Sequence, residues 1–166
     1  MSFRIRPFQK ADFEVLWQID QVCFDPLLAY SRPELAIYMR RPGSFTLVAE
    51  SQADEAVNRR SPLRITGFVV AEVRRRSGHI ITIDVIPSAR RSGIGSILLQ
   101  AAEAQLSRAG AAAVALETPV NNIGAIQFYK RKGYFVEKTV PGYYSNQLDA
   151  LVMTKELVTT PAMPRS

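Results

Sequence analysis

Arg90-Arg91-Ser92-Gly93-Ile94-Gly95-Ser96 is the stretch that decides the fold. It stands between an apolar run that ends at Pro87 and a helical pattern that runs from Ile94 to Leu106. A strand that turns through such a corner into a helix leaves the first helical N–H groups without partners, and the helix dipole adds positive potential there. Two glycines let an anion approach the backbone, and two arginines add charge. The stretch therefore predicts a diphosphate site.

Two other phosphate-binding motifs do not fit this stretch. A P-loop requires Gly-Lys-Ser/Thr after a four-residue gap, and a dinucleotide fingerprint requires a small residue where Leu98 stands. The pattern Arg/Gln-x-x-Gly-x-Gly/Ala fits from Arg90 to Gly95 and resembles the acetyl-coenzyme A signature of the GNAT acetyltransferase superfamily. The alternative is a basic turn that precedes a helix. The resemblance implies a cofactor site made of Ile83, Asp84, Val85, Arg90, Arg91, Ser92, Gly93, Ile94, Gly95, Ser96, Asn122, Ala125 and Tyr129.

The composition is that of one soluble globular domain. The chain has 166 residues, of which 47% are hydrophobic and 22% charged, which is enough to bury a core and is atypical of disorder. We find no apolar run of membrane-spanning length and no signal-peptide core, so we expect a cytoplasmic protein. Cys23 is the one cysteine and cannot form an internal disulfide; we expect it in the core. With one histidine as well, the sequence predicts no metal site.

The net charge of +6 predicts an anionic partner. Nucleic acid is one candidate, because Arg74-Arg75-Arg76 and Arg59-Arg60 form short basic clusters. Both clusters lie beside turns and lack interleaved aromatic residues, which makes a nucleic-acid partner unlikely. Coenzyme A, with its diphosphate and 3′-phosphate, would also suit a basic surface. The charge alone does not separate these two partners.

The order of the expected elements matches the GNAT fold. Apolar periodicity predicts strands over 3–6, 45–50, 63–74, 79–86, 112–117, 134–140 and 148–157. It predicts helices over 12–23, 31–39, 93–110 and 122–133, the first capped by Asp12 and the second by Ser31. By resemblance, these elements form an α/β domain with a mixed, mostly antiparallel sheet of about seven strands and about four flanking helices.

One domain is expected over residues 1–157. The polar stretch 51–62 reads as a loop, and residues 158–166 read as a disordered tail. The resemblance is most specific from Ile83 to Tyr144. Within the superfamily, the chain looks most like the branch of ribosomal-protein N-terminal alanine acetyltransferases.

Acetyl transfer to an amine needs a base for the amine, a donor for the oxyanion and an acid for the departing thiolate. Strand alternation places Glu117 on the same face as Ala113 and Ala115, at the end of an apolar strand where ligands enter mixed sheets. In the branch that the chain resembles, the matching position is the proton acceptor. The resemblance therefore implies that Glu117 is the base. The alternative is a strand-end carboxylate in solvent.

Asn122, Ala125 and Tyr129 follow one another at helical spacing and share a face. Alanine leaves room for the pantetheine arm, the Asn122 amide can hydrogen-bond to it, and the phenol would reach the sulfur as general acid. Asn-x-x-Ala-x-x-x-Tyr followed by Gly-Tyr resembles the second signature of the superfamily and fits from Asn122 to Tyr134. The alternative for Tyr129 is a place in the core.

Asp84 is a charged residue within an apolar strand, and such a residue requires a partner. It either faces the acceptor site and attracts an amine, or it pairs with an arginine on a neighbouring strand. The resemblance implies that the Val85 N–H binds the thioester carbonyl, with Ile83 and Asp84 beside the cofactor. His79 stands next to a turn, and we expect it to be an exposed bystander.

The sequence gives less information about which amine accepts the acetyl group. An α-amino group has a pKa near 8 and lysine a pKa near 10.4, so neutralising the former takes about 3 kcal/mol less. Tyr143 and Tyr144 resemble the paired tyrosines that hold the first residues of the substrate in N-terminal acetyltransferases. The loop from Phe24 to Tyr30 stands where that branch has a compact Phe-Pro-Trp-Ser. The expected acceptor-binding residues are Phe24, Leu27, Tyr30, Asp84, Tyr143 and Tyr144.

The sequence thus favours an acetyl-coenzyme A-dependent N-acetyltransferase that acts on a peptide or protein N-terminus, as a monomer or homodimer and without a membrane partner. Three alternatives remain. The first is an acetyltransferase for a small amine, such as a polyamine, an antibiotic or an amino acid. The second is a non-catalytic domain that senses acyl-coenzyme A, and the third is a nucleic-acid-binding module.

Overall fold

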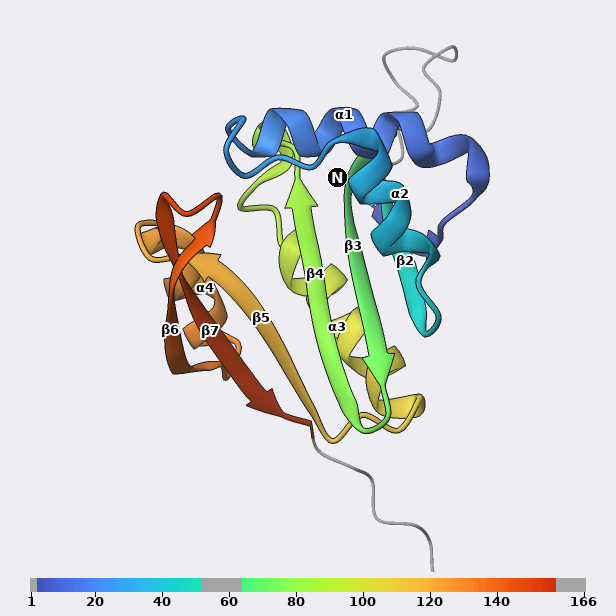
Figure 1. Cartoon of the computed structure of the whole chain (residues 1–166). Helices are drawn as coiled ribbons and strands as arrows, with labels where there is room; N and C mark the ends of the chain where they lie inside the picture. Colours follow the sequence, from blue (N-terminus) through green and yellow to red (C-terminus); the bar gives the residue numbers. More distant parts are fainter. Residues whose placement is uncertain (1–2, 52–63, 158–166) are drawn as a thin grey trace, which may run out of the picture.

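Seven strands form one sheet in the order β1-β2-β3-β4-β5-β7-β6 (Figure 1). The computed structural model describes residues 3–51 and 64–157, so most of the expected 51–62 loop and the expected 158–166 tail lie outside the described residues. The elements are β1 (Phe3–Pro7), a 3₁₀ turn η1 (Lys10–Asp12), α1 (Phe13–Cys23), α2 (Arg32–Arg40), β2 (Ser44–Ser51), β3 (Arg64–Arg74), β4 (Ser77–Val85), a 3₁₀ turn η2 (Pro87–Ala89), α3 (Ile94–Arg108), β5 (Ala113–Pro119), α4 (Ile123–Arg131), β6 (Phe135–Tyr144) and β7 (Leu148–Glu156). The predicted fold class is confirmed.

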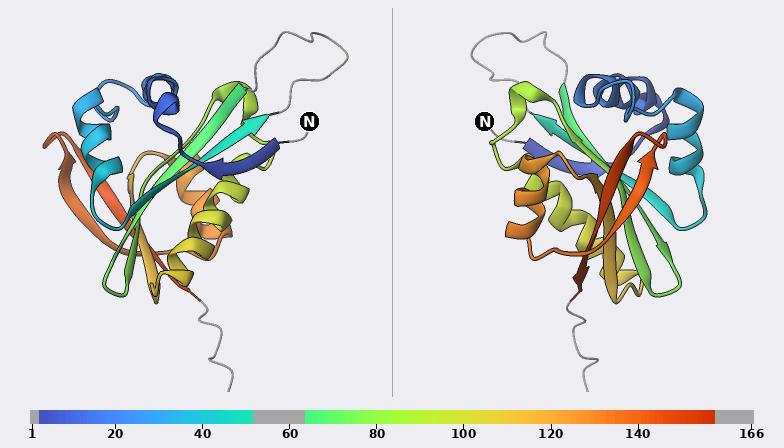
Figure 2. Two further views of the ribbon diagram at one scale, coloured as in Figure 1. Left: turned by 90° about the vertical axis from the view of Figure 1, so that its right-hand side faces the viewer. Right: turned by 60° about the vertical axis from the view of Figure 1, so that its left-hand side comes forward.

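Helices cover both faces of the sheet (Figure 2). On one face, α3 and α4 pack against Leu47 and Ala49 of β2 and their neighbours on β3 to β5. On the other face, α1 and α2 pack against Val48 of β2 and against Phe68 and Val70 of β3. Successive residues of β2 and β3 thus enter two different cores, which explains why these strands read as nearly continuous apolar runs.

The sheet opens between β4 and β5. All neighbouring strands are antiparallel except this pair, which is parallel and is paired only from Ser77–His79 to Ala113–Ala115. Beyond these residues the two strands diverge (Figure 1). The register between β3 and β4 shifts at the same level, because Val70 pairs with Thr82 and Ala71 pairs with Ile80. Such a bulge bends a strand and ends its pairing, so it is a local cause of the divergence.

Both predicted residues stand at the N-cap positions of their helices, but only Ser31 makes the capping hydrogen bond. The Ser31 hydroxyl accepts a hydrogen bond from the Glu34 N–H, as expected for a capping residue. Asp12 makes no such bond to α1. Its carboxylate instead accepts two hydrogen bonds from the Arg6 guanidinium, at 2.8 and 2.9 Å, and one from the Gln9 N–H. A charged partner on β1 therefore outcompetes the helix N-terminus for this side chain.

The last hairpin is longer than the sequence predicts. β6 continues to Tyr144, so the two tyrosines that the sequence placed in a loop belong to a strand. The turn is made by Ser145 and Asn146, whose φ angles of 53° and 57° are both positive. Two successive residues of this conformation form the tight turn that matches the twist of an antiparallel pair. The hairpin therefore carries Tyr144 rigidly to the sheet opening.

Among the described residues, none of the helices combines the length and the apolar character that crossing a bilayer requires.

Gly67 allows β3 to approach the end of β4 closely, and this gives a first prediction. A Cβ atom at this position would lie 2.6 Å from the Asp84 carbonyl oxygen. We expect Gly67→Ala to destabilise the fold by about 1–3 kcal/mol, because the backbone must move to relieve the overlap. Urea unfolding measures this change. Gly124→Ala is the matched control: its Cβ would meet nothing within 4 Å, and alanine in a helix should stabilise α4 by about 0.5–1 kcal/mol. Equal effects of both substitutions would contradict the prediction.

Candidate active site

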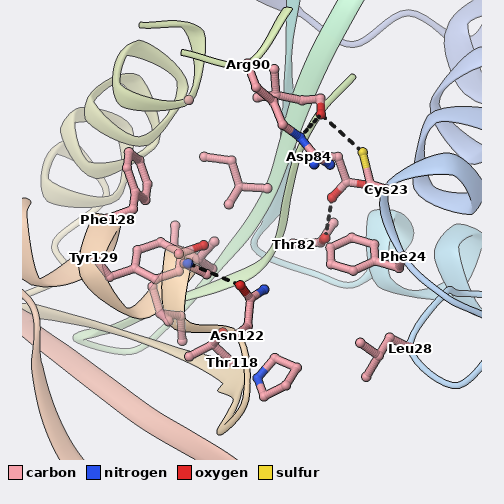
Figure 3. Close-up of a pocket in the computed structure, with 18 of the residues that line it drawn as sticks. Cys23, Phe24, Leu28, Thr82, Asp84, Arg90, Thr118, Asn122, Phe128 and Tyr129 are labelled. Atoms are coloured by element: carbon pink, nitrogen blue, oxygen red, sulfur yellow. Dashed lines mark hydrogen bonds between the residues drawn. The ribbon is translucent and has the colours of Figure 1, made fainter. Parts of the chain in front are cut away.

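A cavity of about 750 Å³ occupies the opening between β4 and β5 (Figure 3). Its walls come from the loop between α1 and α2, the diverging ends of β4 and β5, the glycine corner before α3, the helix α4 and the end of β6. Of the residues that the sequence assigned to the site, it is lined by Phe24, Tyr30, Ile83, Asp84, Val85, Arg90, Arg91, Gly93, Gly95, Ser96, Glu117, Asn122, Ala125, Tyr129 and Tyr144. Leu27, Ser92, Ile94 and Tyr143 are not lining residues.

The glycine corner has the geometry of an anion cradle. Arg91 and Gly93 have φ angles of 65° and 88°, and left-handed residues of this kind turn successive N–H groups toward one point. Gly93 is the N-cap of α3, and nothing lies within 4 Å of the place where a Cβ would stand. The first N–H groups of α3 are therefore not covered by a capping side chain. This corner fits a diphosphate.

Three side chains of the corner bind or pack against other parts of the protein. The Arg90 Nε donates a hydrogen bond to the Val85 carbonyl at 3.0 Å and so ties the corner to the end of β4. The Ser92 hydroxyl donates to the Ala89 carbonyl. The Ile94 side chain is buried in the core beneath α3, so only its backbone can reach a ligand. The sequence predicts the motif, but it does not predict that these three side chains bind or pack against the protein itself.

The α4 wall carries Asn122 and Tyr129. The Asn122 side-chain oxygen caps the helix by accepting from the Ala125 N–H at 3.2 Å, which leaves its amide group as the donor for a ligand. Tyr129 is 8% exposed, and its ring packs edge-on against Phe128 and Tyr134. Burial, and then the nearby Asp84 carboxyl, raise the pKa of Tyr129. The phenol therefore keeps its proton at neutral pH and lines the cavity.

Glu117 and His79 form a pair at the opposite wall. The His79 Nε2 lies 2.7 Å from the Glu117 Oε2, and its Nδ1 lies 3.6 Å from a Glu72 oxygen on β3. The expectation that His79 is an exposed bystander is wrong. Burial lowers the pKa of His79, but the contacts with Glu117 and then Glu72 outweigh it, and the net shift is upward. The imidazole can thus hold a proton next to the Glu117 carboxylate.

Asp84 does not pair with an arginine. Its side chain is 1% exposed; one oxygen accepts from the Thr82 hydroxyl, and the described residues supply no hydrogen-bond donor to the other. Its neighbour is a second buried carboxyl, Asp20 of α1, one oxygen of which likewise has no hydrogen-bond donor among the described residues. Burial, and then the charge of Asp20, raise the pKa of Asp84 well above its usual range. The arginine alternative is therefore wrong, and Asp84 borders the cavity.

The loop between α1 and α2 forms the remaining wall. Phe24, Leu28 and Tyr30 line the cavity from this loop, so Leu28 occupies the position that the sequence assigned to Leu27. Cys23, expected in the core, also borders the cavity, and its Sγ donates to the Val85 carbonyl at 3.3 Å. Burial, and then the Asp84 carboxyl, raise the pKa of this thiol to about 11. The thiol is therefore protonated and is no nucleophile at neutral pH.

Tyrosines converge on the same side. Tyr144 lines the cavity, and the half-exposed ring of Tyr143 packs edge-on against it with 4.9 Å between centroids. Tyr30 packs in a tilted arrangement against Tyr38 of α2 at 5.1 Å. This side of the cavity thus combines aromatic rings with the carboxyl group of Glu117, whereas the glycine corner is basic. The two ends suit ligands of opposite charge.

Comparisons with known proteins agree with this geometry. The model of the acetyltransferase (GNAT) family matches residues 13–134. An uncharacterized N-acetyltransferase of Methanocaldococcus jannaschii is 30% identical over 153 residues, which cover 92% of this chain and 90% of that protein. An N-alpha-acetyltransferase of Sulfurisphaera tokodaii is 37% identical over 83 residues, or 49% of this chain and 50% of that protein. The crystal structure of Ard1 from Thermoplasma volcanium superposes with a TM-score of 0.81 at 26% identity, covering 95% of this chain and 99% of that one.

Proposed function

The chain belongs to the GNAT acetyltransferase family, whose acetyl donor is acetyl-coenzyme A, and on that premise we propose that it acetylates the α-amino group at the N-terminus of a peptide or protein. The observation that carries the proposal is the Glu117–His79 pair, which stands at the acidic, tyrosine-lined end of the cavity. The name of the Sulfurisphaera relative supports the same class of acceptor.

Glu117 is the base in this proposal. It lies two residues before the end of β5, at the cavity wall, and its side chain is 21% exposed, so an amine or a water molecule can reach it. His79 holds the carboxylate in place through the 2.7 Å contact. From this position a carboxylate can accept a proton from an ammonium group, directly or through a water molecule. Glu72 supports His79 in turn from β3.

The glycine corner and α4 would hold acetyl-coenzyme A. The cradle at Arg91 and Gly93 fits its diphosphate, and the Asn122 amide and the small Ala125 fit an amide-bearing arm. When bound, acetyl-coenzyme A supplies the acetyl group as an activated thioester. Tyr129, on the α4 wall, holds a phenol proton that it can donate inside the cavity.

The acidic end of the cavity favours a cationic acceptor. Glu117 lines it together with Tyr144, and its carboxyl group can attract an ammonium group. An α-amine with a pKa near 8 loses its proton to a single carboxylate more readily than a lysine with a pKa near 10.4, by about 3 kcal/mol. Tyr30 and Tyr144 add aromatic surface to the same part of the cavity. We therefore favour an α-amine over a lysine side chain.

Release of free thiol from acetyl-coenzyme A tests the proposal. The acceptors are short peptides that differ in their first residue, the same peptides with a blocked N-terminus and an internal lysine, and a panel of small amines. We expect thiol release only with a free peptide N-terminus. Release with small amines but not with peptides would overturn the acceptor class. Cofactor binding without turnover on any acceptor would overturn the proposed activity.

A further inference from the structure

The end of the loop from Phe24 to Tyr30 is held to α1 by hydrogen bonds at Tyr30. The Asp20 Oδ2 accepts a hydrogen bond of 2.7 Å from the Tyr30 N–H at the end of the loop. The Tyr30 carbonyl in turn accepts from the Trp17 indole at 3.1 Å and the Gln21 amide at 2.7 Å. Asp20 is fully buried. The position of this loop, which lines the cavity, therefore depends on a carboxyl group that lies outside the cavity wall.

Asp20 meets the sheet through Asp84. Each of these carboxyls has one oxygen in a hydrogen bond to the protein, from the Tyr30 N–H and from the Thr82 hydroxyl. Within residues 3–51 and 64–157, the second oxygen of each is buried and has no donor. Two neighbouring carboxyl groups at zero and 1% exposure, each with an oxygen that lacks a donor, repel unless a proton lies between them.

We propose that Asp20 and Asp84 share one proton, and that this carboxyl–carboxyl hydrogen bond fixes the loop from Phe24 to Tyr30 against β4 in the position in which it lines the acceptor side of the cavity. The role in acceptor binding rests on the proposed acetyl transfer, whereas the shared proton does not. Asp84 and Asp20 are thus positioning residues: they act on the acceptor through Phe24, Leu28 and Tyr30.

The surroundings of the pair favour the singly protonated state. Burial raises the pKa of Asp20 and, together with the charge of Asp20, that of Asp84. Arg90 acts in the opposite direction on Asp84 but is outweighed. The groups that face the pair are Cys23 from α1, Tyr30 from the loop, Glu34 from α2, Thr82 from β4, Arg90 from the glycine corner and Tyr129 from α4.

The sign of the pH dependence follows. A carboxyl whose pKa is raised by folding holds its proton below that raised value, so its contribution to stability is complete at acidic pH and is lost as the pH rises through the raised pKa. Above it, two buried carboxylates face each other and the loop loosens. Asparagine at 84 would donate a permanent N–H to Asp20 without a titrating proton. Alanine would remove the partner altogether.

The experiment compares the wild-type chain with Asp84→Asn and Asp84→Ala in the absence of substrates. Hydrogen exchange at the Tyr30 amide, corrected for its intrinsic pH dependence, reports the loop. Infrared spectroscopy reports the carbonyl stretch of a protonated carboxyl. We expect the band at neutral pH in the wild type and its loss in Asp84→Asn. We expect protection of the Tyr30 amide to fall with rising pH in the wild type, to stay constant in Asp84→Asn and to be low throughout in Asp84→Ala.

Acceptor kinetics complete the test. The KM for the acceptor should rise at alkaline pH in the wild type more steeply than in Asp84→Asn. Absence of the protonated-carboxyl band, or equal loss of Tyr30 protection in the Asn and Ala variants, overturns the inference. Because exchange and infrared measurements need no turnover, an inactive protein with the expected band and protection pattern would refute the proposed acetyl transfer and leave the shared proton standing.

Discussion

Replacing Glu117 by glutamine is expected to lower kcat/KM for the acceptor by about 10²- to 10⁴-fold, the range of a lost general base. Glutamine keeps the size of the side chain and can keep the hydrogen bond to His79, so the fold should not change. The affinity for coenzyme A should stay within about twofold, because the cradle at Arg91 and Gly93 lies on the other wall of the cavity. Steady-state kinetics and calorimetric titration of coenzyme A measure the two quantities.

A matched control sharpens this prediction. Glu137→Gln removes the same charge from an exposed position of β6 and should leave the rate unchanged. A loss of coenzyme A affinity in step with the loss of rate would show that Glu117 serves the cofactor and is not the base.

The sequence predicts those parts of the site that depend on local structure. The turn at Gly93 and the start of α3 follow from backbone preferences over a few residues, and the shared face of Asn122, Ala125 and Tyr129 follows from helical spacing. Strand alternation places Glu117 at the cavity wall in the same way. Each of these rules acts within one element.

Contacts between elements are what the sequence does not predict. His79 reaches Glu117 because the parallel register of β4 and β5 sets His79 opposite Ala115, two residues before Glu117 on the same face. The composition of either strand does not specify that register. Asp84 faces Asp20 only after α1 has packed on the sheet. The Asp12 side chain makes no capping bond to α1 because it binds the Arg6 guanidinium on β1. In each case a tertiary partner changes the role of a titratable side chain.

In the proposed reaction, one cavity holds both the donor and the acceptor. The sheet stays continuous because Ser77–His79 pair with Ala113–Ala115, although β4 and β5 part beyond these residues. Backbone groups of the glycine corner provide positive potential at one end. The Glu117 carboxyl of β5 lies at the other end, near Tyr144. The proposed anionic donor and cationic acceptor would thereby be directed to different parts of the same cavity.

Replacing Tyr129 by phenylalanine is the second large effect that we expect. The raised pKa of the phenol keeps its proton available, and the hydroxyl lies on the wall that would hold the thioester. Loss of the hydroxyl should lower kcat by about 10²-fold or more, with the acceptor KM and the coenzyme A affinity unchanged. An acetyl thioester of a more acidic thiol needs less help from a proton donor, so the difference between wild type and Tyr129→Phe should shrink with such a donor.

Tyr134→Phe is the matched control for this prediction. Its ring packs against Tyr129, with centroids 5.7 Å apart, but its hydroxyl is directed to Glu103, which also binds Lys155. The substitution removes the same atom from the neighbouring ring, so it should cost about 0.5–1.5 kcal/mol of stability and leave kcat intact. If both variants lose rate equally, the effect belongs to the packing of the aromatic pair. If Tyr129→Phe alone loses rate but keeps its deficit with the more acidic thiol, the hydroxyl orients the thioester and is not the acid.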